Sequence, residues 1–150
     1  MLREGDQAPD IRLRTEAGEE FRLSDLKGKR VVLYFYPKAD TPGCTTEACE
    51  FRDEIKAFAQ KGIPVVGVSP DNAAAQSRFK QKYSLPFTLL ADAEKSAAEA
   101  YGVWREKNMY GRKVMGIVRT TFVIGPDGTI EKIYSNVKAK GHAAQVLADL

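Results

Sequence analysis

The chain contains two cysteines, Cys44 and Cys49, which stand five positions apart where an apolar segment gives way to a helical pattern. A cysteine in the first turn of a helix meets unpaired backbone N–H groups and the positive end of the helix dipole, and both favour the thiolate over the thiol. Cys44 is therefore a candidate nucleophile. The competing interpretation is that a free cysteine serves as a small buried hydrophobic side chain.

The rest of the sequence offers little other catalytic chemistry. The single histidine, His142, lies near the C-terminus, where we expect a solvated side chain, and no histidine base stands near Cys44 in the sequence, although folding can bring distant residues together. Two cysteines and one remote histidine match no recognised zinc spacing. Neither a P-loop nor a dinucleotide-binding fingerprint is present. We therefore expect no metal and no cofactor.

The composition is that of an ordinary soluble domain. The 150 residues are 43% hydrophobic and 29% charged, and no apolar run reaches the roughly 20 residues that a membrane span needs. The N-terminus has no secretory pattern, so we expect a cytoplasmic protein, in which a close cysteine pair is more often catalytic than a structural disulfide. The net charge of +3 is small and scattered, so we expect no nucleic-acid partner.

Strand and helix patterns alternate along the chain. Strands are expected at 11–15, 21–23, 31–36, 64–69, 87–90, 121–124 and 130–134, and helices at 45–61, from a cap at 71–72 to 83, at 94–101 and at 141–150. The cysteines then bracket the start of the first helix. The alternation predicts one α/β domain over residues 1–150, in three layers, with a central mixed β-sheet flanked by helices. We expect a mobile loop at 104–118.

A family resemblance rests on particular residues. The spacing of Pro37, Thr41 and Cys44, between a buried strand and a helix, resembles the active-site signature of peroxiredoxins. With Cys49 added, the chain resembles the Q-type, atypical two-cysteine group, also called the bacterioferritin comigratory proteins. Further matches are Arg119-Thr120-Thr121-Phe122-Val123-Ile124 and Leu85-Pro86-Phe87-Thr88-Leu89-Leu90-Ala91-Asp92. The resemblance covers nearly the whole chain and implies a thioredoxin-like form of the three-layer fold.

The resemblance also implies roles for six residues. They are Cys44 as the peroxidatic cysteine, Cys49 as the resolving cysteine, Thr41 as a hydroxyl that contacts the peroxide, Pro37 as a shield of the thiolate, Arg119 as the cation, and Glu47 as the residue that orients this arginine. Attack on an O–O bond places negative charge on the departing oxygen, which donors from Thr41 and Arg119 can stabilise. The plainer alternatives are an N-cap for Thr41, an exposed strand-edge arginine, and a first-turn acid for Glu47.

The spacing of the cysteines constrains the cycle that the resemblance implies. In an ideal helix, residues five apart have Cα atoms about 8.6 Å from each other. A disulfide needs Cα atoms within about 7 Å, so forming it must unwind the start of the helix. The implied cycle runs from the Cys44 sulfenic acid to an internal disulfide with Cys49, which thioredoxin then reduces. An internal resolving cysteine removes the need for a dimer, so we expect a monomer, without forbidding a weak dimer.

Two other functions remain open at this point. One is a thiol-disulfide oxidoreductase of thioredoxin type, although the C-x-x-C spacing is absent and no proline immediately precedes the strand at 121–124. The other is a binding protein in which the cysteines are incidental. The sequence does not determine which peroxide is preferred. A peroxide-consumption assay with and without thioredoxin distinguishes the three possibilities.

Overall fold

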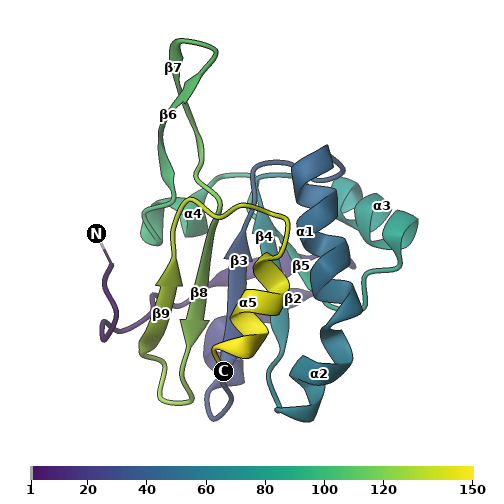
Figure 1. Cartoon of the computed structure of the whole chain (residues 1–150), viewed down its shortest axis with the longest axis vertical. Coiled ribbons are helices and arrows are strands. Elements are labelled where there is room, and N and C mark those ends of the chain that lie inside the picture. The colour runs from purple at the N-terminus through teal and green to yellow at the C-terminus, as the bar shows by residue number, and fades with distance from the viewer. Residues whose placement is uncertain (1) are drawn as a thin grey trace.

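The computed structural model describes residues 2–150, which fold around one mixed β-sheet (Figure 1). Its seven strands lie in the order β2-β1-β5-β4-β3-β8-β9. Their bounds are β1 Arg12–Thr15, β2 Glu20–Arg22, β3 Val31–Phe35, β4 Val65–Ser69, β5 Thr88–Ala91, β8 Thr120–Ile124 and β9 Ile130–Tyr134. The helices are α1 Pro42–Asp53, α2 Ile55–Gln60, α3 Ala73–Tyr83, α4 Ser96–Ala100 and α5 His142–Ala148, with a short 3-10 helix at Leu23–Leu26. The three-layer α/β prediction is confirmed.

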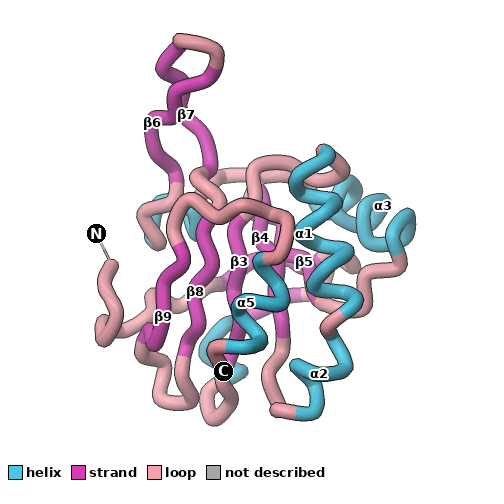
Figure 2. Tube along the Cα trace, viewed as in Figure 1, coloured by secondary structure: helices cyan, strands magenta, loops and turns pink. Residues whose placement is uncertain are grey.

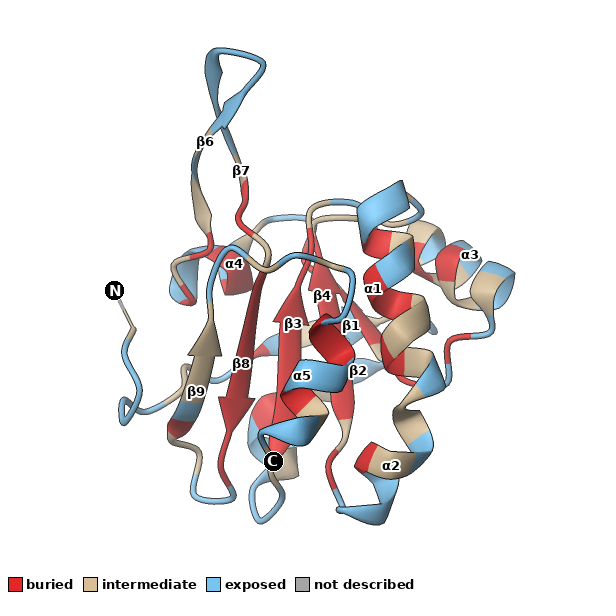
Figure 3. Cartoon of the chain, viewed as in Figure 1, coloured by how far each residue is buried: buried red, intermediate tan, exposed pale blue. Residues whose placement is uncertain are grey.

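The central strand β3 separates two hydrophobic cores. Because side chains alternate along a strand, Val31 and Leu33 pack with one cluster, while Val32 and Tyr34 pack with the other. The first cluster includes α4, and the second includes α1, α3 and α5. Figure 1 accordingly shows α1 and α5 in front of the sheet and α4 behind it. In Figure 3, β3 and β8 are buried along their whole length.

The first long helix differs from its predicted form. It begins at Pro42, whose fixed φ and missing N–H suit the first helical position, and it ends at Asp53. At Glu54 the backbone (φ −99°, ψ 3°) interrupts the helix, and the separate helix α2 follows. The prediction of a single helix at 45–61, with the two cysteines on either side of its start, is therefore wrong. Cys44 and Cys49 both lie inside α1.

The expected mobile loop at 104–118 is instead a β-hairpin. Strands β6 (Trp104–Met109) and β7 (Arg112–Ile117) pair antiparallel over six residues each. Both residues of the connecting turn have positive φ, 53° at Tyr110 and 79° at Gly111, as a two-residue hairpin turn requires. Tyrosine rarely adopts this conformation, so the sequence signal for the turn was weak. Figure 2 shows the hairpin extending away from the rest of the molecule.

The single histidine is buried, which contradicts the expected solvated position. His142 is 3% exposed at the start of α5, where its Nε2 is 2.7 Å from the hydroxyl of Thr121. Its ring meets those of Phe51 and Tyr134 edge-on. Burial and the charge of Arg119 lower the pKa of His142 to about 4, so the ring is neutral at physiological pH. Its role is to pack α5 against the sheet and α1.

Candidate active site

The start of helix α1 holds the predicted nucleophile. Cys44 is the third residue of the helix and is 1% exposed. The first intrahelical bond runs from the N–H of Thr45 to the carbonyl of Thr41, so the N–H groups before it lie at the open helix end. Thr41 occupies the N-cap position, but its hydroxyl donates to the carbonyl of Lys38 at 2.8 Å instead of capping the helix. The thiol therefore lies where the helix favours a negative charge.

Arg119 brings a cation to the sulfur from a distant part of the sequence. Strand β8 pairs antiparallel with β3, so the start of β8 lies beside the end of β3, where the chain turns into α1. Arg119 immediately precedes β8, and its Nη2 lies 3.3 Å from Cys44 Sγ. The side chain is 16% exposed. The alternative of an exposed strand-edge arginine is therefore wrong.

Glu47 holds the other end of the same guanidinium. Its Oε1 accepts a 2.6 Å hydrogen bond from Arg119 Nη1, and the side chain is fully buried. Burial raises the pKa of Glu47 to about 7, and the charge and hydrogen bond of Arg119 oppose this rise. Although burial lowers the pKa of Arg119, the charges of Glu47 and Cys44 give a net increase, so the arginine remains protonated. The contact fits an orienting carboxylate.

The remaining two predicted residues lie on either side of the thiol along the chain. Cys49 is partly exposed, further along the same helix, and both cysteines are free. Pro37 is half-buried in the segment between β3 and α1. The structure therefore brings Cys44, Glu47 and Arg119 into contact. It places Thr41 at the helix end and Cys49 inside the helix.

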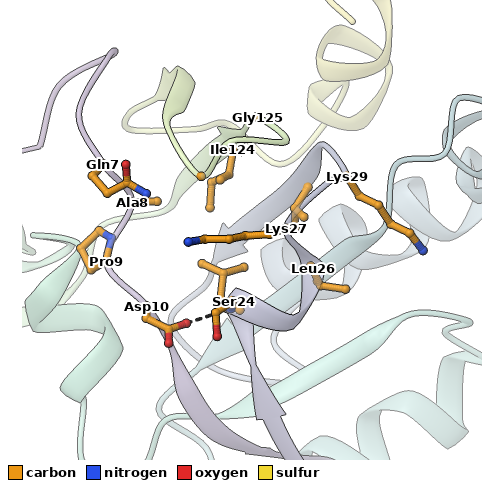
Figure 4. Close-up of a pocket in the computed structure, with 13 residues that line it drawn as sticks. Gln7, Ala8, Pro9, Asp10, Ser24, Leu26, Lys27, Lys29, Ile124 and Gly125 are labelled. Atoms are coloured by element: carbon orange, nitrogen blue, oxygen red, sulfur yellow. Dashed lines mark hydrogen bonds between the residues drawn. The ribbon is translucent and has the colours of Figure 1, made fainter.

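The side chains around Cys44 suit thiol chemistry. Within residues 2–150, no group of three or more metal-ligating side chains is close enough to hold an ion. A cavity of about 380 Å³ lies elsewhere (Figure 4), lined by Asp10, Lys27, Val31 and Ile124 among others. Val31 begins β3 and Ile124 ends β8, so the cavity is at the sheet end opposite Cys44. None of the helices in the described residues has the length and apolar character needed to cross a membrane.

A sequence model of the AhpC/TSA family matches residues 4–133, which include all six predicted site residues. The chain belongs to this family. A putative peroxiredoxin Bcp of Coxiella burnetii is 51% identical over 146 residues, covering 97% of each chain. Peroxiredoxin Bcp of Bacillus subtilis is 49% identical over 146 residues, covering 97% of this chain and 93% of the relative. The predicted resemblance to Q-type peroxiredoxins is confirmed.

Solved structures of the family agree with the fold. A PrxQ mutant of Xylella fastidiosa superposes with a TM-score of 0.94 at 36% identity, covering 99% of this chain and 95% of that one. The bacterioferritin comigratory protein of Xanthomonas campestris superposes with a TM-score of 0.88 at 37% identity, covering 93% and 88%. The thioredoxin-like fold is confirmed. The enzyme is a peroxiredoxin, which reduces a peroxide at the expense of a thiol reductant.

Proposed function

We propose that Cys44 is the peroxidatic cysteine of this peroxidase. Its thiolate attacks one oxygen of the peroxide, the O–O bond breaks, and the other oxygen leaves as hydroxide or alkoxide and takes up a proton. The sulfur is oxidised to a sulfenic acid. The contact between Arg119 Nη2 and the buried Cys44 sulfur, at 3.3 Å, is the observation that carries this assignment. Arg119 supplies a fixed cation at the place where both the thiolate and the leaving oxygen carry negative charge.

Thr41, Pro37 and Glu47 complete the first step. The Thr41 hydroxyl donates its own proton to Lys38, so its oxygen is left to accept a hydrogen bond from a peroxide O–H. Glu47 keeps the guanidinium of Arg119 directed at the sulfur. In this proposal Pro37, which lies in the segment between β3 and α1, shields the thiolate with its apolar ring. These roles support peroxide reduction without any cofactor.

Cys49 is the resolving cysteine in this proposal. Its thiol attacks the Cys44 sulfenic acid, water leaves, and an intramolecular disulfide forms. Both cysteines lie in α1, where ideal helix geometry keeps Cα atoms five residues apart at about 8.6 Å, beyond the roughly 7 Å limit of a disulfide. The first turns of α1 must therefore unwind between the two steps.

A dithiol reductant completes the cycle, and we assign thioredoxin to this role. It reduces the disulfide by thiol exchange, which releases both cysteines and lets α1 refold. Because the resolving cysteine is internal, a single chain completes the cycle, and we propose a monomer acting in the cytoplasm as one domain. Hydrogen peroxide and organic hydroperoxides are the proposed substrates. Alkyl peroxide reduction activity is described for the bacterioferritin comigratory protein of Xanthomonas campestris.

Peroxide consumption by three forms of the protein tests the assignment. Wild type should turn over continuously with thioredoxin, its reductase and NADPH. Cys44→Ser should consume essentially none. Cys49→Ser should consume one equivalent and stop as a sulfenic acid. Continued consumption by Cys44→Ser would refute the role of Cys44, and turnover of wild type with a small dithiol but not with thioredoxin would refute the reductant.

A further inference from the structure

The β6–β7 hairpin is part of the active-site end of the molecule. Strand β7 ends at Ile117, and Arg119 follows two residues later. The backbone N–H of Val118 donates to the carbonyl of Val103 at 2.8 Å, which ties this segment to the residue before β6. The hairpin therefore fixes the chain just before the arginine that contacts Cys44.

Lys107 reaches along the hairpin toward this segment. It lies on β6 directly opposite Val114, on the same face as Gly116. Gly116 has no side chain, and a Cβ atom at that position would lie 3.0 Å from Lys107 Cδ. The lysine side chain passes over the glycine, and Lys107 Nζ donates to the carbonyl of Ile117 at 2.7 Å. Two extended residues span about 7 Å, so this contact holds the ammonium close to the backbone of Arg119.

The position of Lys107 is unusual for a lysine. The side chain is partly buried, and among residues 2–150 it forms no ion pair with a carboxylate. Burial and the charge of Arg119 lower the pKa of Lys107, while the charge of Cys44 raises it. The ammonium therefore lies where Arg119 repels it and where the Cys44 thiolate attracts it.

We propose that Lys107 is a second cation of the active site, held by Gly116 and Ile117, that stabilises the Cys44 thiolate together with Arg119. This inference rests on the proposed role of Cys44. Lys107 acts on the thiolate through its charge and not by direct contact, since its ammonium binds the carbonyl of Ile117 and not the sulfur. The other titratable groups that share this environment are the buried Glu47, which binds Arg119, and the buried Tyr34 and Tyr36, which are neutral.

The test compares Lys107→Met with Lys113→Met in a Cys49→Ser background. Lys113 lies on the same hairpin, with its side chain 79% exposed, and serves as the matched control. The pH dependence of Cys44 alkylation by iodoacetamide reports the stability of the thiolate independently of peroxide chemistry. A second cation near the thiolate, at a partly screened site, is worth roughly a three- to tenfold effect. In Lys107→Met, we expect half-maximal alkylation at a pH higher by about 0.5 to 1, and a three- to tenfold slower reaction with hydrogen peroxide at pH 6.

Lys107→Arg, which retains the charge, should stay near wild type in both measurements, and so should Lys113→Met. If Lys107→Met behaves like Lys113→Met, or if Lys107→Arg is as impaired as Lys107→Met, the proposal is refuted. If Lys107→Met does not fold, Lys107→Gln decides the question. It keeps a hydrogen-bond donor for the carbonyl of Ile117 but no charge, and the proposal requires the same change in the same direction. Peroxide consumption by Cys44→Ser would instead refute the proposed function itself.

Discussion

Two buried groups should give this protein opposing pH dependences of stability. Burial raises the pKa of Glu47 from 4.5 to about 7, and burial with the charge of Arg119 lowers the pKa of His142 from 6.5 to about 4. The folded state favours the protonated carboxyl of Glu47 and the neutral ring of His142. At about 1.4 kcal/mol for each pKa unit, either group changes the free energy of unfolding by about 3 kcal/mol between its two limits.

The contributions of Glu47 and His142 to the free energy of unfolding change with pH in opposite directions. The contribution of Glu47, whose folded pKa is raised, is fully present below about pH 4.5 and is lost as the pH rises through about 7. The contribution of His142, whose folded pKa is lowered, is fully present above about pH 6.5 and is lost as the pH falls through about 4. In wild type, the two changes largely cancel between about pH 4.5 and 6.5.

Single substitutions should reveal each dependence. Glu47→Gln keeps an oxygen for Arg119 but does not titrate, so its stability relative to wild type should rise by about 3 kcal/mol from pH 4.5 to 7, because the loss that Glu47 causes in wild type is absent. His142→Gln keeps a polar partner for Thr121, and its stability relative to wild type should fall by about 3 kcal/mol from pH 4 to 6.5, because the gain that His142 causes in wild type is absent. Urea denaturation of the reduced proteins at several pH values gives these free energies, and subtracting the wild-type curve removes the titration of shared groups.

Glu106→Gln is the control, because this carboxylate is 61% exposed on the hairpin. Its stability curve should run parallel to that of wild type. If the curves of Glu47→Gln and His142→Gln are also parallel to wild type, the two groups do not titrate as their burial requires. The reasoning from burial to stability would then be wrong.

Three further outcomes follow from the geometry. Arg119→Lys should slow peroxide reduction at least tenfold, because lysine keeps the charge but not the fork of donors, and Arg119→Ala should slow it further and also lower the melting temperature, because it leaves the buried Glu47 without its partner; rapid mixing and thermal melts on the same variants measure both effects. One equivalent of peroxide should form the Cys44–Cys49 disulfide and lower amide protection over residues 41–51 alone, which hydrogen exchange with mass spectrometry detects. Tyr110→Asn should stabilise the hairpin by about 1 kcal/mol in urea denaturation, because asparagine tolerates positive φ better than tyrosine.

Much of the fold was predictable because its signals are local. The continuous apolar run of β3 identified a central strand, and the side chain of Asn72 caps α3 as expected, accepting from the N–H of Ala75 at 2.8 Å. The break at Glu54 and the turn at Tyr110 were missed. At Tyr110, which is fully exposed, the pairing of β6 with β7 holds a positive φ that tyrosine rarely adopts, and at Glu54 the residue type gives no sign of a helix break.

The site shows the same division between local and long-range information. Cys44 was identifiable from its place at a strand-to-helix junction, but nothing local in the sequence indicates that Arg119 lies 3.3 Å from its sulfur. The family resemblance supplied that pairing. His142 was misplaced because proximity to the C-terminus says little about burial when the last helix packs on the sheet. Lys107 was missed because its segment was interpreted as a loop.

The first turns of helix α1 must be folded for one step of the proposed cycle and unwound for the next. Its folded N-terminus favours the Cys44 thiolate, while the proposed disulfide requires the same turns to unwind. Phe51 limits that unwinding, since its fully buried ring stacks on Tyr34 with centroids 4.7 Å apart. The break at Glu54 then separates α1 from α2. Unwinding that stops before Phe51 releases both cysteines. Of the second hydrophobic cluster it removes only Cys44 and Ala48, while Phe51 and the other aromatic members stay packed, so the fold that restores the site after reduction is kept.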